Sequence, residues 1–467
     1  MATAERFTTF YKTLLGKDGS MAKATDLQIK DVTCAFEPIA FRTPLKFGDR
    51  VQKTAVLVNV DVVVESRDGK HKGQGYGSMP LGNLWSWPST VCTPDQTEAA
   101  MKLFVEEIVN LAQICTEAGH PIDLVYHLAG EYPHLAKTLA VRNKMPEALP
   151  ALAQLVAASA LDAALHDAFG RMHQMSSYDV LTKKYMTFDL SEYLDKSFAG
   201  EYLDRYTLRI PAETLALYHL VGAVDPLTAG DVAQKIGDGL PEYLGEWIVR
   251  DQLTHLKIKL RGNDPGWDRA RILGVDQVAT TTAQQTQWHY SLDFNEQCES
   301  ADVVLSLLNF LKTDHPAIYE RIEYIEQPTH RDLAAHAISM HEVAKLKPVV
   351  IDESLVDYDA LVAARDLGYS GVAIKACKGQ TESLLLAAAA QKFGMFLCVQ
   401  DLTCPGASFL HSASLAAHLP GIKAVEGNGR QYCPAANKIW ARDYPEVFTV
   451  KHGVIQTAAM NGPGLGF

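Results

Sequence analysis

The sequence predicts an α/β protein that combines a modified TIM (β/α) barrel with an α+β capping domain. In the second part of the chain, a short apolar run followed by a loop and a helix-like stretch recurs eight times, as in a parallel barrel. Before it, the pattern is different, with strands first and helices afterwards. A chain of 467 residues is long enough for two such domains.

The first elements predicted are the strands of a meander-like sheet. Residues 32–36, 53–65 and 75–79 are rich in β-branched side chains or bounded by turn residues. Residues 73–77 hold three glycines, and we interpret this cluster as a turn.

Helices are expected next, over residues 95–175. Within them, residues 152–170 carry small and apolar side chains nearly all round, which is typical of a buried helix. Residues 176–212 are rich in tyrosine and have no clean period, so we expect a connector or an insertion there.

Eight barrel strands follow. They are predicted at residues 215–223, 253–260, 289–295, 322–328, 348–354, 371–377, 395–401 and 421–428. A doubly wound open sheet would show the same alternation, but it often has a glycine-rich phosphate loop after its first strand, and the sequence has none. We therefore expect the barrel at 210–429 and the capping domain at 1–200.

Composition excludes several function classes. The formal net charge of −12 argues against a nucleic-acid partner, and no apolar run is long enough for a membrane span. The amino terminus lacks the apolar core of a signal peptide, and the eight cysteines form no CxxC pair, so we expect a cytoplasmic protein with reduced thiols. The sixteen histidines show no HxH or HExxH spacing, and a zinc site is not expected.

From the second barrel strand onward, each apolar run ends near a charged residue. In order, these are Lys257 with Lys259, then Asp293, Glu326, Asp352, Lys375, Asp401 and Glu426. Because the carboxyl ends of parallel strands meet at one mouth of a barrel, these side chains should form a ring there. This mouth is where barrel enzymes carry out their chemistry.

The residue types in this ring indicate metal-assisted proton abstraction. Lys257 and Lys259 are two positions apart, so they point to the same face of a strand. Lysines are rarely buried unless their charge is paired, so two inward lysines indicate a function. The next three strands supply three carboxylates, Asp293, Glu326 and Asp352, which are the hard oxygen ligands that Mg²⁺ prefers. A metal bound there would stabilise the charge of an enediolate formed from a substrate carboxylate.

The lysines are the candidate bases. A like charge beside Lys259 disfavours its ammonium form, so it can act as a base, and Lys375 arrives from the opposite side of the ring. Asn295 shares the face of Asp293 and should orient a ligand, while Glu353 should stand behind the ligands and support them.

For the remaining charged residues, two readings stay open. Asp401 and Glu426 are either groups that select the substrate or ordinary loop anchors. Lys378 starts a loop and is expected to be solvated.

Five motifs in this order resemble those of the enolase superfamily, and most of all its muconate lactonizing enzyme-like branch. They are Leu-Lys-Ile-Lys-Leu, Leu-Asp-Phe-Asn, Ile-Glu-Gln-Pro, Ile-Asp-Glu-Ser and Ala-Ile-Lys, between residues 256 and 375. The resemblance implies catalytic Lys257, Lys259 and Lys375, Mg²⁺ on Asp293, Glu326 and Asp352, a small-molecule carboxylate substrate and a homo-oligomer. It also implies that residues 430–467 return to complete the α+β capping domain. Segments 39–50 and 77–89 of this cap, with Trp85 and Trp87, would then shape the substrate pocket.

Some positions depart from that family. Ser78 stands where many members carry a glutamate, and the seventh strand ends in Gln400 and Asp401 instead of a histidine. The latter difference disfavours the mandelate racemase branch. The chain also looks longer than its relatives, chiefly near residues 176–250.

Several reactions are compatible with this ring. Racemisation or epimerisation, cycloisomerisation and elimination, the last as in an acid-sugar dehydratase, can share one enediolate. A Schiff-base aldolase with Lys375 as nucleophile would leave Lys257 and the three acids unexplained. A non-catalytic barrel gives no reason for inward lysines beside three acids.

Overall fold

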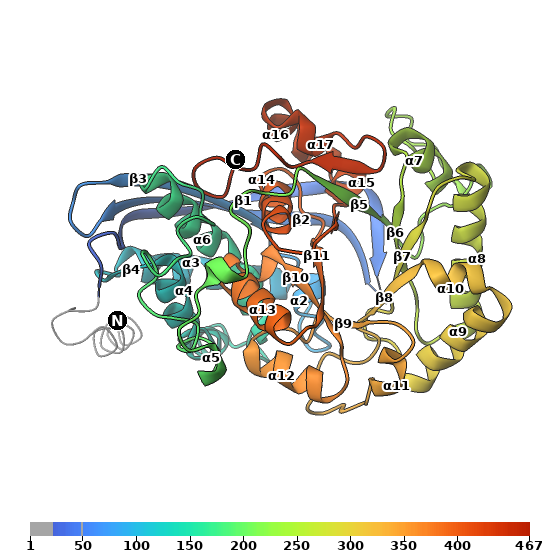
Figure 1. Cartoon of the computed structure of the whole chain (residues 1–467), viewed down its shortest axis with the longest axis horizontal. Helices are drawn as coiled ribbons and strands as arrows, with labels where there is room; N and C mark the ends of the chain where they lie inside the picture. Colours follow the sequence, from blue (N-terminus) through green and yellow to red (C-terminus); the bar gives the residue numbers. More distant parts are fainter. Residues whose placement is uncertain (1–21, 48–49) are drawn as a thin grey trace.

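The computed structural model describes residues 22–47 and 50–467, and in this part of the chain a sheet with helices lies against a barrel (Figure 1). The segment of the predicted capping domain before residue 22 lies outside the described residues, as do two positions of segment 39–50. The expected fold class, a closed parallel barrel with a capping domain, is confirmed.

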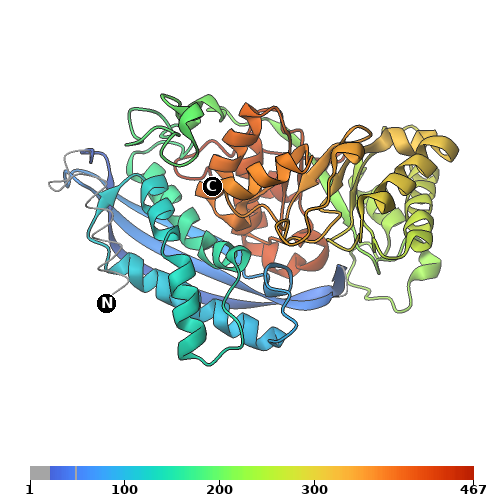
Figure 2. The same cartoon turned by 90° about the horizontal axis from the view of Figure 1, so that it is seen from below.

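The cap begins with an antiparallel sheet in the order β3-β2-β1-β4. Its strands are β1 (Leu27–Phe47), β2 (Arg50–Ser66), β3 (Lys72–Pro80) and the short β4 (Ala118–Gly119). Alternate valines of β2 (Val58, Val60, Val62 and Val64) are buried, as expected for a strand with one face against a core. The long β1 and β2 reach from the cap across to the barrel mouth (Figures 1 and 2).

Helices cover one face of this sheet. They are α2 (Asn83–Ser86), α3 (Pro94–Gln113), α4 (Pro121–Ala129), α5 (Tyr132–Arg142) and α6 (Ala151–Met172). The helix predicted at 152–170 is α6, and it is buried on nearly every side.

The glycine cluster at 73–77 is part of strand β3, so its interpretation as a turn was wrong. The glycines are there because α6 packs directly onto β3. A Cβ atom on Gly75 would lie 2.2 Å from the carbonyl oxygen of Ala164, and one on Gly77 would lie 1.9 Å from that of Ala160. Only residues without a side chain permit this contact.

Residues 176–212 are irregular, as expected, apart from short 3₁₀ turns at η1 (Lys196–Phe198) and η2 (Leu203–Arg205). The segment is ordered by its own contacts. Tyr193 donates a hydrogen bond to the buried Asp123 of α4, and Tyr178 stacks on His418, with ring centroids 3.7 Å apart.

All eight predicted barrel strands are present. They are β5 (Thr214–Val221), β6 (His255–Lys259), β7 (His289–Asp293), β8 (Ile322–Glu326), β9 (Val349–Ile351), β10 (Gly371–Lys375), β11 (Phe396–Gln400) and β12 (Ala424–Glu426). Neighbouring strands pair in parallel, and β12 pairs with β5 to close the barrel. Each strand is shorter than the apolar run that predicted it, which matters at the site.

Helices connect the strands on the outside of the barrel. They are α7 (Leu244–Asp251), α8 (Pro265–Thr282), α9 (Ala301–Asp314), α10 (Pro316–Arg321), α11 (His341–Ala344), α12 (Tyr358–Asp366), α13 (Gln380–Lys392) and α14 (Ala407–Ala417). Short turns η3 (Ala229–Asp231) and η4 (Ala376–Lys378) lie in the loops after β5 and β10.

The carboxyl-terminal segment returns over both parts of the molecule. It forms α15 (Gly429–Tyr432), η5 (Pro434–Asn437), α16 (Lys438–Asp443), α17 (Pro445–Phe448) and β13 (Val454–Gln456). Strand β13, which we did not predict, pairs antiparallel with β5, while Leu465 donates its backbone N–H to Asp167 of α6. The domain boundaries themselves stay a prediction. In the described part of the chain, no helix is both long and apolar enough to cross a membrane.

Candidate active site

Lys257 lies at the centre of the barrel mouth and is 1% exposed. Its ammonium group donates hydrogen bonds to Glu326 Oε1 at 2.8 Å and Glu426 Oε2 at 3.0 Å, and it lies 3.2 Å from Asp293 Oδ2. Burial alone would lower the pKa of Lys257, but the surrounding carboxylates outweigh it and raise that pKa well above the ordinary value. The structure thus places a fixed positive charge among three acids.

Lys259 follows on the same face of β6, one layer nearer the solvent. It forms an ion pair with Asp293, and it lines the same cavity as Lys257. The alternation expected for these two lysines is therefore what the strand produces.

Asp293, Glu326 and Asp352 lie at the ends of β7 and β8 and directly after β9. All three are buried, with at most 1% of each residue exposed. Burial acts to raise the pKa of Asp293, but Lys259 and Lys257 hold it below its ordinary value. In the same way, Lys375 and Lys378 overcome burial and lower the pKa of Asp352 to about 2.

The pKa of Glu326 is shifted the other way. Burial and then the neighbouring Asp293 raise it well above its ordinary value, in spite of Lys257. Asn295 Oδ1 and Glu353 Oε2, beside these acids, are buried acceptors without a hydrogen-bond partner in the described part of the chain. Since acids that repel one another and unpaired acceptors both favour a further cation, the donor set fits a divalent metal ion.

Lys375 comes from β10, on the other side of the mouth. It donates a hydrogen bond to Asp352 Oδ2 at 2.7 Å, and its ammonium nitrogen lies 4.5 Å from the centre of the Trp85 ring. Burial acts to lower the pKa of Lys375, but Asp352 together with Glu326 and Glu426 raises it above its ordinary value. The cap thus contacts one of the two candidate bases directly.

The expectation that Lys378 is solvated was wrong. Turn η4 directs the chain back toward the mouth, and Lys378 is 2% exposed, with its ammonium 3.2 Å from Asp352 Oδ1. Burial lowers the pKa of Lys378. A run of alternating residues could not reveal this, because the strand ends at Lys375 and the alternation ends with it.

Asn295 and Glu353 lie side by side. Asn295 has a left-handed backbone, with φ of 45°, so it does not continue the face of β7, and its Nδ2 lies 3.4 Å from Glu353 Oε1. Trp85 Nε1 donates to the same oxygen at 2.9 Å. Burial and then the adjacent Asp352 raise the pKa of Glu353 to about 7. These residues link the acids to the cap.

Gln327 holds the loops after β8 and β9 together, a role that we did not predict. Its Oε1 accepts the backbone N–H of Asp352 at 2.9 Å, and its Nε2 donates to Ser354 Oγ at 2.9 Å. Its backbone has φ of 29°, and Asn295 and Thr403, also just after barrel strands, are left-handed too. Strained backbone gathered at one end of the strands is typical of a functional site.

Asp401 and Glu426 close the ring on the far side. Asp401 accepts the backbone N–H groups of Thr403, Cys404 and Asn428, so it anchors two loops while also lining the cavity. Burial and then Glu426 raise the pKa of Asp401 to about 8. Glu426 accepts from Lys257. Asp401 thus has the contacts of a loop anchor, and Glu426 belongs to the charged ring.

A cavity of about 40 Å³ lies beside this ring, between the barrel mouth and the cap. Its floor and walls include Lys257, Lys259 and Lys375, and the cap residues Leu45, Phe47, Gln52 and Trp85 cover it. Both cap segments that we expected to shape a substrate pocket contribute to this cover. A cavity of this size has room for little more than a water molecule.

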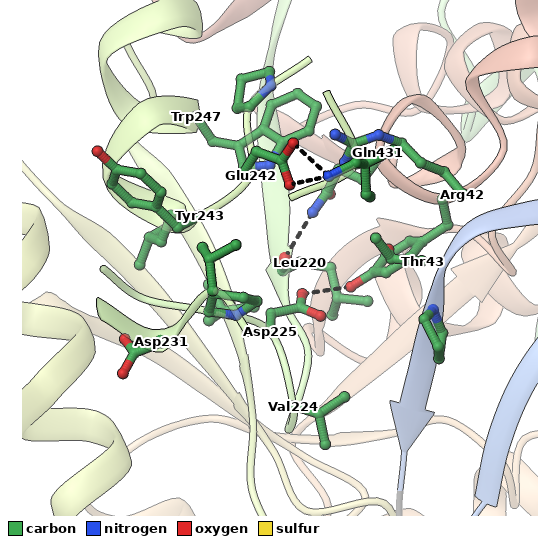
Figure 3. Close-up of a pocket in the computed structure, with 18 of the residues that line it drawn as sticks. Arg42, Thr43, Leu220, Val224, Asp225, Asp231, Glu242, Tyr243, Trp247 and Gln431 are labelled. Carbon is green, nitrogen blue, oxygen red and sulfur yellow. Dashed lines mark hydrogen bonds between the residues drawn. The ribbon is translucent and has the colours of Figure 1, made fainter. Parts of the chain in front are cut away.

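A larger pocket, of about 350 Å³, lies beside it (Figure 3). It is bounded by Arg42 and Thr43 of β1, the long loop after β5, and Trp247 of α7. Gln431 Oε1 is buried there without a partner among the described residues. Leu220 lines both spaces and stands between them.

Comparison with known proteins gives a family match for the second part of the chain. Residues 240–467 match the family model of the enolase C-terminal domain-like proteins. A search of curated proteins gave no match.

Solved structures show the same fold. The chain is similar to the L-Ala-D/L-Glu epimerase from Bacillus subtilis, with 17% identity, a TM-score of 0.62 and coverage of 94% of this chain and 98% of that one. It is also similar to an N-succinyl Arg/Lys racemase from Bacillus cereus, with 16% identity, a TM-score of 0.60, and 94% and 95% covered. A muconate lactonizing enzyme from Pseudomonas fluorescens has 18% identity, a TM-score of 0.57, and 94% and 96% covered.

Proposed function

We propose that this chain is an enzyme of the enolase superfamily, whose C-terminal domain-like model matches residues 240–467, and that it removes the α-proton of a small-molecule carboxylate. The reaction would pass through an enediolate and end in isomerisation, as racemisation, epimerisation or cycloisomerisation. The named activities of the similar structures, epimerase, racemase and lactonizing enzyme, support an isomerase. Cytoplasmic location and a homo-oligomeric state stay predictions.

One observation carries the proposal. Lys259 and Lys375 line a single cavity from β6 and β10, four strands apart in an eight-stranded barrel. Two amines on opposite sides can address opposite faces of one carbon atom, which is what inversion of a stereocentre requires.

Asp293, Glu326 and Asp352 would hold Mg²⁺. When bound, the metal would neutralise the negative charge that develops on the substrate carboxylate as the α-proton leaves. Lys257 and Lys375 lie within hydrogen-bond distance of Glu326 and Asp352, so both ammonium groups would withdraw from these carboxylates as the cation arrives.

The roles of the lysines follow from their positions. Lys259 would take the proton from one face of the α-carbon, and Lys375 would return a proton to the other face. Lys257, deepest in the barrel and paired with Glu426, would remain a cation facing the substrate carboxylate. Trp85 and Glu353 would fix the side of the site on which Lys375 lies.

Two other reactions use the same residues differently. An acid-sugar-type dehydratase would keep the proton abstraction and then expel a β-hydroxyl group, so it is a lyase with the same first step. A Schiff-base aldolase would use Lys375 as nucleophile and would need neither the acids nor a metal.

The test is exchange of the α-hydrogen in D₂O, followed by NMR over a set of carboxylates that includes dipeptides and N-acylated amino acids. We expect exchange that depends on Mg²⁺ and that falls by about 10²–10⁴-fold in Lys259→Ala and Lys375→Ala, the usual contribution of a general base. Lys345→Ala, a surface lysine on the same barrel, is the matched control and should exchange like the wild type.

The outcomes separate the alternatives. Loss of a β-hydroxyl group with the exchange indicates the dehydratase. Trapping of a lysine adduct by borohydride without metal-dependent exchange indicates the aldolase and contradicts the proposal. Exchange from both faces in Lys375→Ala would remove this residue from the mechanism.

A further inference from the structure

A second group of chemically competent side chains lies at the opposite end of the barrel. His255 and His289 begin strands β6 and β7, and Glu323 is the second residue of β8. The acids and lysines of the mouth end these same three strands, so the two groups lie at opposite ends of them. Nothing in the proposed reaction uses the second group.

The three side chains converge. The imidazole rings of His255 and His289 stack with centroids 4.4 Å apart and an interplanar angle of 12°. His289 Nδ1 lies 2.8 Å from Glu323 Oε1, and one ligand atom from each of the three residues lies within 4.8 Å of the others. Ligand atoms about 2.0–2.2 Å from a shared metal ion lie up to about 4.4 Å apart, so these three side chains are close to the spacing that one ion requires.

The backbone places Glu323 there through an irregularity. His255 and His289 are paired across β6 and β7, but between β7 and β8 the register shifts, with Tyr290 opposite Ile322 and Ser291 opposite Tyr324. Glu323 is thus the extra residue of a β-bulge. Bulges commonly redirect a side chain, and this one sets the carboxylate beside His289.

Neighbouring groups orient these ligands. Thr254 Oγ1 lies 2.8 Å from His255 Nδ1, which leaves the other ring nitrogen of His255 for a ligand. The Tyr218 hydroxyl donates to Glu323 Oε2, and Oε1 is the oxygen that contacts His289. Such partners on the far atoms of ligands are a regular feature of metal sites, where they fix the ring or carboxylate orientation.

We propose that His255, His289 and Glu323 form a binding site for a divalent transition metal ion, with Zn²⁺ as the ion that the ligand set favours. Two imidazoles and one carboxylate suit Zn²⁺ and disfavour Mg²⁺, which takes oxygen ligands. The site joins β6, β7 and β8 at the amino-terminal end of the barrel, so its role is to hold these strands together. At this end of barrel proteins, stability rather than catalysis is the usual function.

The site is also accessible. The side chains of His289 and Glu323 are 28% and 33% exposed, so an ion can reach them from solvent.

The experiment uses full-length, tag-free protein that has been freed of metal and then saturated with Mg²⁺ to occupy the acids of the mouth. Co²⁺ is titrated as the probe, and its visible d–d bands and the heat of binding are recorded. We expect one tight site per chain, and binding at least about tenfold weaker in His289→Gln and in Glu323→Gln. His134→Gln, an exposed histidine on α5, is the control and should bind like the wild type.

Zn²⁺ should displace Co²⁺ from the wild type and remove the bands. Circular dichroism checks that each variant folds, and the Glu323 variant serves if the His289 variant does not. The inference is overturned if the wild type shows no cobalt bands, or if binding is equal in the wild type and both site variants. This test is independent of the proton-abstraction proposal, because it measures no turnover and concerns the other end of the barrel.

Discussion

The contact between β3 and α6 provides the sharpest test of how the cap is built. In Gly77→Ala, the new Cβ would lie 1.9 Å from the carbonyl oxygen of Ala160 and 2.8 Å from the backbone nitrogen of Ala164. Non-bonded atoms need at least about 3 Å, so helix and strand must separate by roughly 1 Å in a core packed as densely as a crystal. Since the obstacle is helix backbone, no side chain can rotate to relieve it.

The magnitude follows from two opposing effects. Overpacking of a core destabilises by about 1–3 kcal/mol, and a backbone clash belongs at the upper end of that range. Alanine also removes conformational freedom that glycine has in the unfolded chain, which returns about 0.5–1 kcal/mol. The net loss should be about 2 kcal/mol, or about 4–8 °C in the melting temperature of a unit of 150–250 residues.

Calorimetry or the near-UV circular dichroism melt would measure this shift. Gly230→Ala is the matched control, because a Cβ there meets only Thr228 Oγ1, at an ordinary 3.7 Å. A Gly77→Ala protein that melts within about 1 °C of the wild type would refute the packing argument. Activity should fall with stability, since α6 also carries Asp162, which accepts hydrogen bonds from Thr381 just after η4.

Three further predictions concern charge and metal. Burial raises the pKa of Asp162 to about 7, so this carboxyl stabilises the folded state in full below about pH 3.8 and loses that contribution as the pH rises through about 7. In urea unfolding, the stability of Asp162→Asn relative to the wild type should therefore rise by up to roughly 4 kcal/mol across this pH window. An equal pH dependence in both proteins would contradict the assignment. Mg²⁺ at 100 times its Kd should stabilise the wild type by about 2.7 kcal/mol, and chelation should reverse this, whereas equal stabilisation of Asp293→Asn would place the ion elsewhere. Trp85→Phe leaves a buried oxygen of Glu353 without its indole donor and should cost about 1–3 kcal/mol in thermal unfolding, more than Trp87→Phe, whose acceptor Glu147 is half-buried; a larger loss in the control would refute this.

The sequence predicted the barrel well because each of its strands is signalled locally. A parallel strand is buried on both faces, so it appears as a short apolar run, and the eight runs needed no long-range information. Strand β13 has three residues and gains its place only by pairing antiparallel with β5, which no local pattern reports. The glycines of β3 show the same limit, because a turn and a strand that packs on a helix both select glycine.

At the site, alternation was reliable only as far as the strand extended. Lys257 and Lys259 lie within β6 and share a face, as predicted. Asn295 and Lys378 lie beyond the ends of β7 and β10, where a left-handed residue or a 3₁₀ turn changes the direction of the chain. The positions of these two side chains depend on tertiary contacts, so the alternation of residues along a strand could not predict them.

The residues at the amino-terminal end of the barrel were the hardest to predict from sequence. Strand β6 presents His255, Lys257 and Lys259 on one face, each two residues after the last. The same strand thus contributes to the proposed metal site at one end of the barrel and to the active site at the other. The two-residue spacing that drew attention to the lysines also places His255 on the inward face. No acid stands close enough to His255 in the sequence to indicate a metal site. The partners of His255 are 34 residues away on β7 and, through a bulge, on β8. A metal site whose ligands come one from each strand has no characteristic sequence spacing, so the absence of HxH and HExxH motifs could not exclude it. Only the closed barrel brings the three residues together.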